Sequence, residues 1–377
     1  MKQVVITAAQ TVTALGDSLE QTWQGLQEGR SAIAPVSRFD CSRYHAKIAA
    51  VVPELHAAPG ESLCSPLLEK LLANFATVPA DTRLLLATTK GPIDLLEVQQ
   101  RAGQAPDHTV LPEALLGNLQ QRFGLKQPGL NLNAACASST IALARAGAMI
   151  AHGRTECVLV ICLDLVSEFV LAGFSALKGL STRASRPFDR ERDGLSLGEG
   201  AAALLLMSAE RAQREAHAPL GRLLGWGVAN DANHITAPAR DGSGLIAAVR
   251  CALQTAQLGS DAIAAISAHG TGTVYNDAME LTAFAALFKQ RPLPVNSIKG
   301  AIGHTLGAAG GIEAALALRS LQAQQLLPTV GLQQPEDQTE QRLSASPQPF
   351  CGEVLLSTNS GFGGINAALL LATGETP

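Results

Sequence analysis

The chain has 377 residues, of which 47% are hydrophobic, 4% aromatic and only 16% charged. Its formal net charge of -4 excludes a general attraction to nucleic acid or to an anionic membrane surface. A charged share below the roughly 25% of a typical soluble domain predicts buried helices or a large subunit interface.

The apolar runs and the cysteines predict a cytoplasmic protein without a membrane span. The run Val158–Leu163 ends at Asp164, far short of the roughly 18–20 residues that cross a bilayer. The first ten residues have the pattern of a strand and lack the apolar length of a signal peptide. The seven cysteines are odd in number and include no C-x-x-C pair, which predicts reduced thiols rather than disulfides or a zinc knuckle.

Strand and helix patterns alternate along the chain, which predicts an α/β fold. Two segments, Ser138–His152 and Thr305–Leu321, are apolar almost all round and predict one buried helix in each half. We therefore expect two similar halves, over residues 1–215 and 216–377, that meet near the polar segment Ser208–Pro219. Short apolar runs typical of strands covered on both faces occupy residues 4–7, 84–88, 156–163 and 201–207, and then 220–229, 262–268, 294–297, 353–358 and 367–372.

Cys136 is the first candidate for chemistry. It lies in N-A-A-C-A-S (133–138), where a strand pattern ends and the first buried helix begins. The positive end of the helix dipole favours a thiolate there, and the small neighbours leave room for a substrate. A buried structural cysteine is the alternative interpretation of this segment alone.

Three further segments place polar groups beside apolar strands. His269 follows the run 262–268 at a strand end, where α/β folds hold ligands, although this segment alone favours a core histidine. Lys299 and His304 lie in a glycine-rich string that matches no phosphate-binding loop and also suits close helix packing. The segment S-G-F-G-G (360–364) predicts a hairpin turn, and its N–H groups would also suit an oxyanion hole.

One cysteine, two histidines, one lysine and a Gly-Phe-Gly-Gly turn, in this order, resemble the condensing enzymes of the thiolase superfamily. The sequence is most similar to the beta-ketoacyl-[acyl-carrier-protein] synthases of the type II elongating and polyketide kind. The resemblance covers nearly the whole chain and includes F-S-A-L (174–177), R-P-F-D-R-E-R-D-G (186–194) and G-E-G-A (198–201). It implies a thiolase-like, five-layered α/β/α/β/α fold with two similar halves.

The resemblance also implies a reaction and its residues. Cys136 would take an acyl group, and a malonyl group on acyl carrier protein would lose carbon dioxide and attack it to give a 3-oxoacyl product. His269 and His304 match the histidines that bind the malonyl thioester carbonyl, and Lys299 matches the lysine that orients the second of them. The other implied roles are an oxyanion hole from the N–H groups of Cys136 and Phe362, a lysine partner in Glu313, pantetheine contacts from Thr271 and Thr273, a gate in Phe362 beside Gly361 and Ser360, and structural acids in Asp277 and Glu280.

Several departures from the family predict a specialised synthase of a lipid, polyene or polyketide pathway. The chain is shorter than typical members, mainly between residues 57 and 115. Ser360 stands where the family motif N-S-F-G-F-G-G has its first Phe, which predicts a smaller and more polar pocket wall. Asn133 and Ala134 replace the usual residues two and three positions before the cysteine.

The implied partners are acyl carrier protein and a second related subunit, in a homodimer or a heterodimer. Because the carrier is acidic, we expect a basic patch at the pocket mouth, with Arg190 and Arg192 as the best candidates. No cofactor is expected beyond the carrier's phosphopantetheine arm. A zinc site at Cys136, His269 and His304 is rejected, because the spacing is not that of a metal site and Lys299 would repel the ion.

Three other classes are considered. A chain-length-factor-like partner subunit with little activity of its own is the alternative function, although such subunits usually lack the cysteine. A thiolase would need a second catalytic cysteine, and Cys351 lacks its setting. A dehydrogenase would need G-x-G-x-x-G after the first strand, and this chain has none there.

Overall fold

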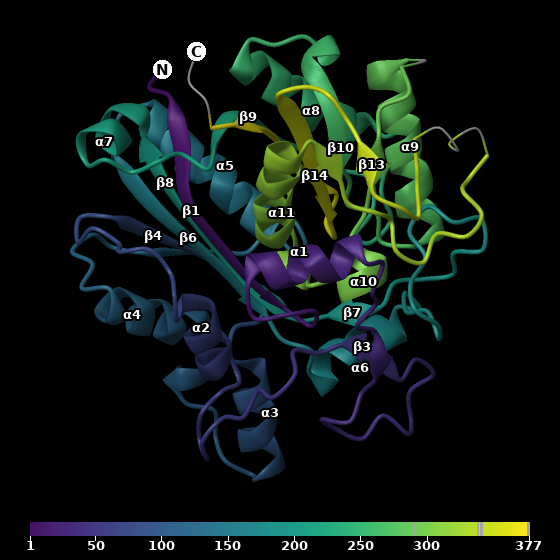
Figure 1. Ribbon diagram of the computed structural model, residues 1–377. Coiled ribbons are helices and arrows are strands. Elements are labelled where there is room, and N and C mark those ends of the chain that lie inside the picture. Colours follow the sequence, from purple (N-terminus) through teal and green to yellow (C-terminus); the bar gives the residue numbers. More distant parts are fainter. Residues whose placement is uncertain (290, 338, 340–341, 375–377) are drawn as a thin grey trace.

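The computed structural model describes residues 1–289, 291–337, 339 and 342–374 (Figure 1). Its centre is a ten-stranded sheet in the order β11-β10-β14-β15-β9-β1-β8-β6-β4-β5. The strands are β1 (Val4–Thr13), β4 (Arg83–Ala87), β5 (Leu130–Leu132), β6 (Cys157–Asp164) and β8 (Gly200–Ser208), and then β9 (Gly221–Asn230), β10 (Ile263–Ser267), β11 (Val295–Asn296), β14 (Val354–Gly361) and β15 (Ile365–Thr373).

The sheet consists of two five-stranded halves with one topology. In each half the third strand lies at the outer edge, followed by the second, fourth, fifth and first strands. The second strand is parallel to the third and the fourth, and the remaining pairs are antiparallel, in both halves. This repeat confirms two similar halves. The division of the chain at residues 215 and 216 remains a prediction.

The two halves join through their first strands. β1 pairs with β9 over Val5–Arg222 and Ile6–Gly221, and it also pairs with β8 along its whole length. The polar segment expected at the junction forms α7 (Ala209–Arg214), between β8 and β9.

Helices complete the predicted five layers. α5 (Ser138–Ala151) and α11 (Ala309–Ala323) pack together between the two halves of the sheet (Figure 1). α2 (Cys64–Leu72) and α4 (Pro112–Arg122) cover the outer face of the first half. α8 (Ser243–Ala256) and α9 (Val274–Phe288) cover the outer face of the second half.

Small residues set the approach of the two central helices. A Cβ atom at Gly310 would lie 1.9 Å from Oγ1 of Thr140, and one at Gly311 would lie 2.3 Å from Sγ of Cys162. Glycine is therefore needed at both positions for α11 to reach α5 and β6. This close packing brings the start of each central helix to the opposite half of the molecule.

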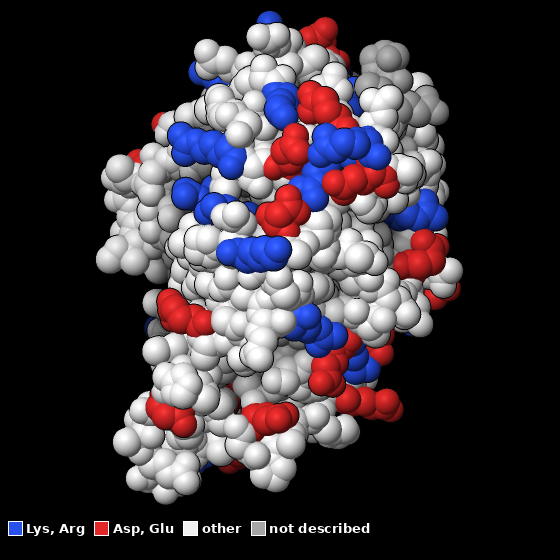
Figure 2. Space-filling model, turned by 90° about the vertical axis from the view of Figure 1, so that its left-hand side faces the viewer, with Lys and Arg blue, Asp and Glu red and all other residues white. Residues whose placement is uncertain are grey.

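None of the helices in the described part of the chain is long and apolar enough to cross a membrane. Lys, Arg, Asp and Glu are intermixed on the face shown in Figure 2. The other elements are α1 (Leu19–Gln27), α3 (Ile93–Arg101), α6 (Glu168–Ala176), α10 (Lys299–Ile302), the sheet of β2 (Ala34–Pro35), β3 (Ile48–Ala50) and β7 (Leu197–Gly198), the pair β12 (Gln325–Leu326) and β13 (Gln348–Pro349), and the 3₁₀ turns His108–Val110, Ser260–Ala262 and Leu306–Ala308.

Candidate active site

Cys136 lies on a sharp turn between β5 and α5. The residue before it, Ala135, has a φ of +50°, in the left-handed region that favours glycine. The hydroxyl of Ser138 holds this turn, because it accepts from the N–H of Ala134 at 2.8 Å and donates to the carbonyl of Ala135 at 2.6 Å. The turn therefore presents the cysteine at the start of the central helix.

Cys136 is buried, and burial is the main influence on the protonation state of its thiol. Burial raises the pKa of the Cys136 thiol to about 11, against opposing effects of the Lys299 charge and the N–H of Phe362. The thiolate expected from the helix N-terminus is therefore outweighed in the resting state, and the group is a neutral thiol at pH 7. Gly361 lies so close that a Cβ there would be 3.2 Å from the Cys136 nitrogen.

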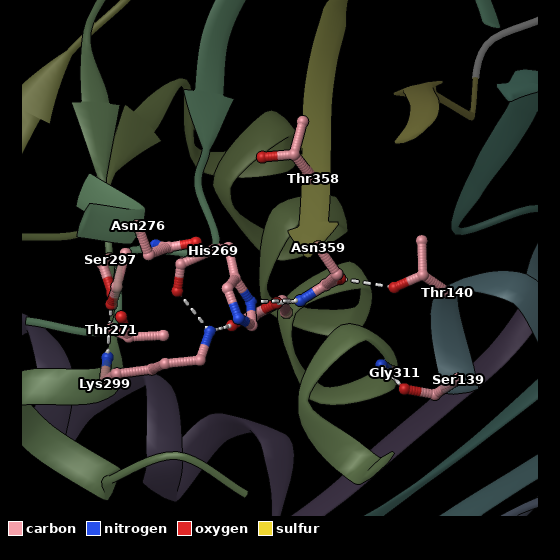
Figure 3. A network of polar contacts seen from close by, with 12 residues as sticks. Ser139, Thr140, His269, Thr271, Asn276, Ser297, Lys299, Gly311, Thr358 and Asn359 are labelled. Atoms are coloured by element: carbon pink, nitrogen blue, oxygen red, sulfur yellow. Dashed lines mark hydrogen bonds and ion pairs between the residues drawn. The ribbon is translucent and has the colours of Figure 1, made fainter. Parts of the chain in front are cut away.

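His269 has its tautomer fixed by Asn359. The Nδ2 group of Asn359 donates to Oε2 of Glu313 at 2.7 Å, and its Oδ1 accepts from the hydroxyl of Thr140, which settles the orientation of the amide. The same Nδ2 lies 3.2 Å from Nδ1 of His269, so this ring nitrogen accepts and the proton resides on Nε2 (Figure 3). Asn359 was not among the expected site residues, although it belongs to the same glycine-rich motif.

His304 follows α10 through Gly303, whose φ is +66°. Its backbone is held by bonds of 2.7 Å to the Ser196 carbonyl and 3.0 Å from the Gly198 N–H. Its Nδ1 is buried and, among the described residues, has no hydrogen-bond partner. Its ring meets that of His269 edge to face, with centroids 5.1 Å apart.

Both imidazoles are neutral at pH 7. Burial is the main cause that lowers the pKa of His269 well below its ordinary value, and the charge of Lys299 and then His304 lower it further. Burial and then the charge of Lys299 likewise lower the pKa of His304 well below its ordinary value. The pair thus offers N–H donors and lone pairs rather than positive charge.

Lys299 forms an ion pair with Glu313, as expected. Its Nζ also donates to the backbone carbonyl of His269 at 2.5 Å, as Figure 3 shows. Burial raises the pKa of Glu313, while Lys299 and Asn359 oppose this effect. The expectation that Lys299 orients the second histidine is wrong for this geometry, because its side-chain contacts go to the first histidine and to Glu313.

The three candidate reacting groups converge. The ligand atoms of Cys136, His269 and His304 all lie within 4.8 Å of one another. The spacing argument against zinc is therefore wrong, because positions far apart in the sequence meet in space. The rejection of a zinc site stays a prediction, and it now depends on Lys299 alone, whose Nζ donates to the carbonyl of His269.

Asp277 and Glu280 hold the loop around His269 through its backbone. The two carboxylate oxygens of Glu280 accept from the N–H groups of His269 at 2.8 Å and Gly270 at 2.7 Å. Asp277 accepts from the N–H groups of Phe188 and Thr271 at 2.8 and 3.0 Å. Both acids are fully buried, which agrees with the structural role expected for them.

A cavity of about 350 Å³ leads to the cysteine and the histidines. All five expected substrate-binding residues line it, and Phe362 stacks on Phe174 with ring centroids 5.7 Å apart. The hydroxyls of Thr271 and Thr273 lie 2.9 Å apart in its wall. The five are Thr271, Thr273, Ser360, Gly361 and Phe362.

The docking prediction for Arg192 is wrong. Its side chain is buried, forms an ion pair with Glu336 and donates to the carbonyl of Asp189 at 2.8 Å. Arg190 is about half exposed, but it pairs with Asp337 and donates to the Pro335 carbonyl at 2.9 Å. Neither arginine lines the cavity. Both instead bind the 335–337 segment and hold it against the R-P-F-D turn.

The fold and this site define a thiolase-fold condensing enzyme, and two family models match the chain. The model "Beta-ketoacyl synthase, N-terminal domain" covers residues 1–63 and 86–212, and "Beta-ketoacyl synthase, C-terminal domain" covers residues 220–333. The chain belongs to the beta-ketoacyl synthase family. Residues 64–85 lie outside the match, and they fall within the 57–115 region that we expect to be shorter than in typical members.

Individual relatives agree with this assignment. The chain is 29% identical to "3-oxoacyl-[acyl-carrier-protein] synthase 2" of Synechocystis sp., over 98% of this chain and 97% of the relative. A beta-ketoacyl synthase structure from Burkholderia phymatum is 29% identical with a TM-score of 0.89, covering 100% of both chains. "The ishigamide ketosynthase/chain length factor" is 26% identical with a TM-score of 0.90, covering 99% of both chains.

Proposed function

We propose that this chain is a 3-oxoacyl-[acyl-carrier-protein] synthase. It would catalyse the decarboxylative condensation of an acyl group held on Cys136 with a malonyl group on acyl carrier protein. The observation that carries the proposal is the Nε2–H tautomer of His269, set by Asn359 within the cluster of Cys136 and His304. A neutral, buried N–H donor suits the oxygen on which negative charge develops during decarboxylation.

In the first step Sγ of Cys136 attacks the acyl thioester, and the bond between the acyl carbon and the carrier's sulfur breaks. Because the thiol is neutral at pH 7, its proton must leave during the attack. His304 is the group that takes this proton and returns it to the departing sulfur, since His269 already carries its hydrogen on Nε2. The product is an acyl-Cys136 thioester and a free carrier thiol.

In the second step the malonyl carboxylate leaves as carbon dioxide, and its electrons form an enolate at the thioester. Nε2–H of His269 donates to the enolate oxygen and stabilises it. The enolate carbon attacks the acyl-Cys136 carbonyl, whose oxygen is held by the N–H groups of Cys136 and Phe362. The bond from the acyl carbon to Sγ then breaks, and Sγ leaves as a thiolate that takes its proton from water.

The partners follow from this chemistry and from the surface. The phosphopantetheine arm of acyl carrier protein enters along Thr271 and Thr273. The reaction needs no cofactor besides this arm. The edge strand β5 and the low charge content support pairing with a second copy or a related subunit. The seven free cysteines support a cytoplasmic location.

The test is intact-protein mass spectrometry after incubation with a panel of acyl carrier protein thioesters. We expect one acyl mass gain that Cys136→Ala abolishes and that the matched control Cys251→Ala, at an exposed thiol, retains. Malonyl carrier protein added next should release the acyl group as the 3-oxoacyl product. The absence of any mass gain would contradict the proposal and favour a chain-length-factor-like partner role.

A further inference from the structure

One wall of the active-site cavity is a row of three polar side chains. Ser360 at the end of β14 donates to Oδ1 of Asn366 on β15 at 2.7 Å. Nδ2 of Asn366 donates to Oδ1 of Asp231 at 2.6 Å and to the carbonyl of Gly364 at 3.1 Å. We call Ser360, Asn366 and Asp231 the polar row, and all three line the cavity that holds Cys136.

The directions of these hydrogen bonds are determined. Asp231 and the Gly364 carbonyl have only acceptors, so the amino group of Asn366 must face them. Oδ1 of Asn366 then faces Ser360, and the single hydroxyl hydrogen of Ser360 is used in that bond. Asn366 is itself buried and turns both of its polar atoms to these partners.

The row therefore presents only acceptors to the cavity. The Ser360 oxygen keeps its lone pairs, and no described residue donates to it. The Asp231 carboxylate takes the N–H of Ala239 at 2.8 Å besides Asn366, and no ion pair within the described part of the chain neutralises it. Acceptors in a partly enclosed wall are satisfied by a ligand that brings a donor, and an alkyl chain leaves them without one.

Building on the proposed condensation, we propose that the polar row selects an acyl group that carries a hydroxyl. The hydroxyl donates to the Ser360 oxygen while the acyl carbon is bonded to Cys136. Ser360 is the specificity-determining residue, because its neighbour Gly361 lies directly against the Cys136 backbone. A ketone reduction must supply such a substrate, since condensation itself yields a 3-oxo group.

The experiment compares acylation of Cys136 by matched donors. Octanoyl carrier protein is set beside octanoyl donors with one hydroxyl on the third, fifth or seventh carbon, and second-order loading rates are measured by intact mass. We expect at least one hydroxylated donor to load about tenfold faster than octanoyl, the size of one satisfied hydrogen bond. Octanoyl loading as fast as every hydroxylated donor would overturn the inference.

Two variants of equal shape locate the effect. Ser360→Thr keeps the oxygen and should retain the preference, whereas Ser360→Val replaces it with a methyl group and should abolish it. Equal preferences in the two variants would overturn the role of Ser360. Loading of octanoyl without discrimination leaves the proposed function intact, while the absence of loading by every donor overturns both proposals.

Discussion

The two halves of the sheet share one parallel register, between β4 and β6 in the first half and between β10 and β14 in the second, but the side chains just beyond these strands have different roles. Parallel register places Ala87 beside Cys162 in the first half and Ser267 beside Ser357 in the second. Two residues further along, the same alignment brings Thr89 to Asp164 and His269 to Asn359. One position in the fold is thus used twice, once between Thr and Asp and once between His and Asn.

The contacts at these positions differ in chemistry. Asp164 accepts from the backbone and hydroxyl of Thr89 and from the N–H of Gly307. Asn359 accepts from Thr140 and donates to His269. A carboxylate with only acceptors fastens loops, whereas an amide with a donor also sets a tautomer. The comparison teaches that one position of the fold serves as a structural junction in the first half and sets the tautomer of a histidine in the second half.

The largest expected effect is the difference in kcat between variants of His269 and of Thr89, the residue at the same position in the first half. His269→Ala should lower kcat for condensation by about 10²–10³-fold, because it removes a donor to the developing oxyanion. Thr89→Ala should change kcat by less than about threefold, because Asp164 keeps its other donors. Steady-state condensation assays check both, and a comparable loss in Thr89→Ala would contradict the division of roles.

The turns before the two reacting residues also correspond. Ala135 precedes Cys136 and Gly303 precedes His304, and both have positive φ. Gly303→Ala should destabilise the protein by about 3 kcal/mol or more, because its Cβ would lie 2.3 Å from the Leu197 carbonyl oxygen.

Ala135→Gly is the matched control for this turn. Relief of backbone strain and the greater freedom of the unfolded chain nearly cancel, so we expect a change within about 0.5 kcal/mol. Urea unfolding measures both variants. An unchanged free energy of unfolding in Gly303→Ala would contradict the prediction and show that the turn can move its backbone away from the Leu197 carbonyl oxygen.

Asp164→Asn tests the structural junction itself. Its new amino group would face the N–H of either Thr89 or Gly307, so one buried donor would lose its acceptor. We expect a loss of about 2 kcal/mol in the free energy of unfolding. At a temperature where the variant is folded, kcat should fall by less than about threefold. A large kcat loss with unchanged stability would assign Asp164 a chemical role instead.

The last expected effect concerns the dependence of stability on pH. Burial, followed by the charge of Asp277, raises the pKa of Glu280 from 4.5 to about 7. Between these values the folded state binds more protons than the unfolded state, so stability should fall as pH rises from about 4.5 to about 7. The slope from this group is at most about 1.4 kcal/mol per pH unit. Unfolding titrations of wild type and Glu280→Gln measure it, and equal slopes would contradict the assignment.

The sequence pointed to candidate reacting residues but not to the contacts between them. Cys136, His269, Lys299 and His304 were each ambiguous alone and became candidates through the order of their motifs, which resembles the family. The role of Asn359 depends on the register between β10 and β14, which no local pattern reveals. The docking prediction for Arg192 is wrong because the residue type alone does not show whether a side chain is buried. The order of the ten strands was not predicted, because it depends on pairings between segments that are distant in the sequence.

The pairing of β1 has a consequence for biosynthesis. Its strand partners begin at Gly200 and Gly221, so β1 has no strand partner until synthesis has passed Gly200. At about 5–20 residues per second, that delay is roughly 10–40 s. During this time the backbone of β1 has no strand to pair with, and a chaperone that shields β1 would raise the yield of folded enzyme.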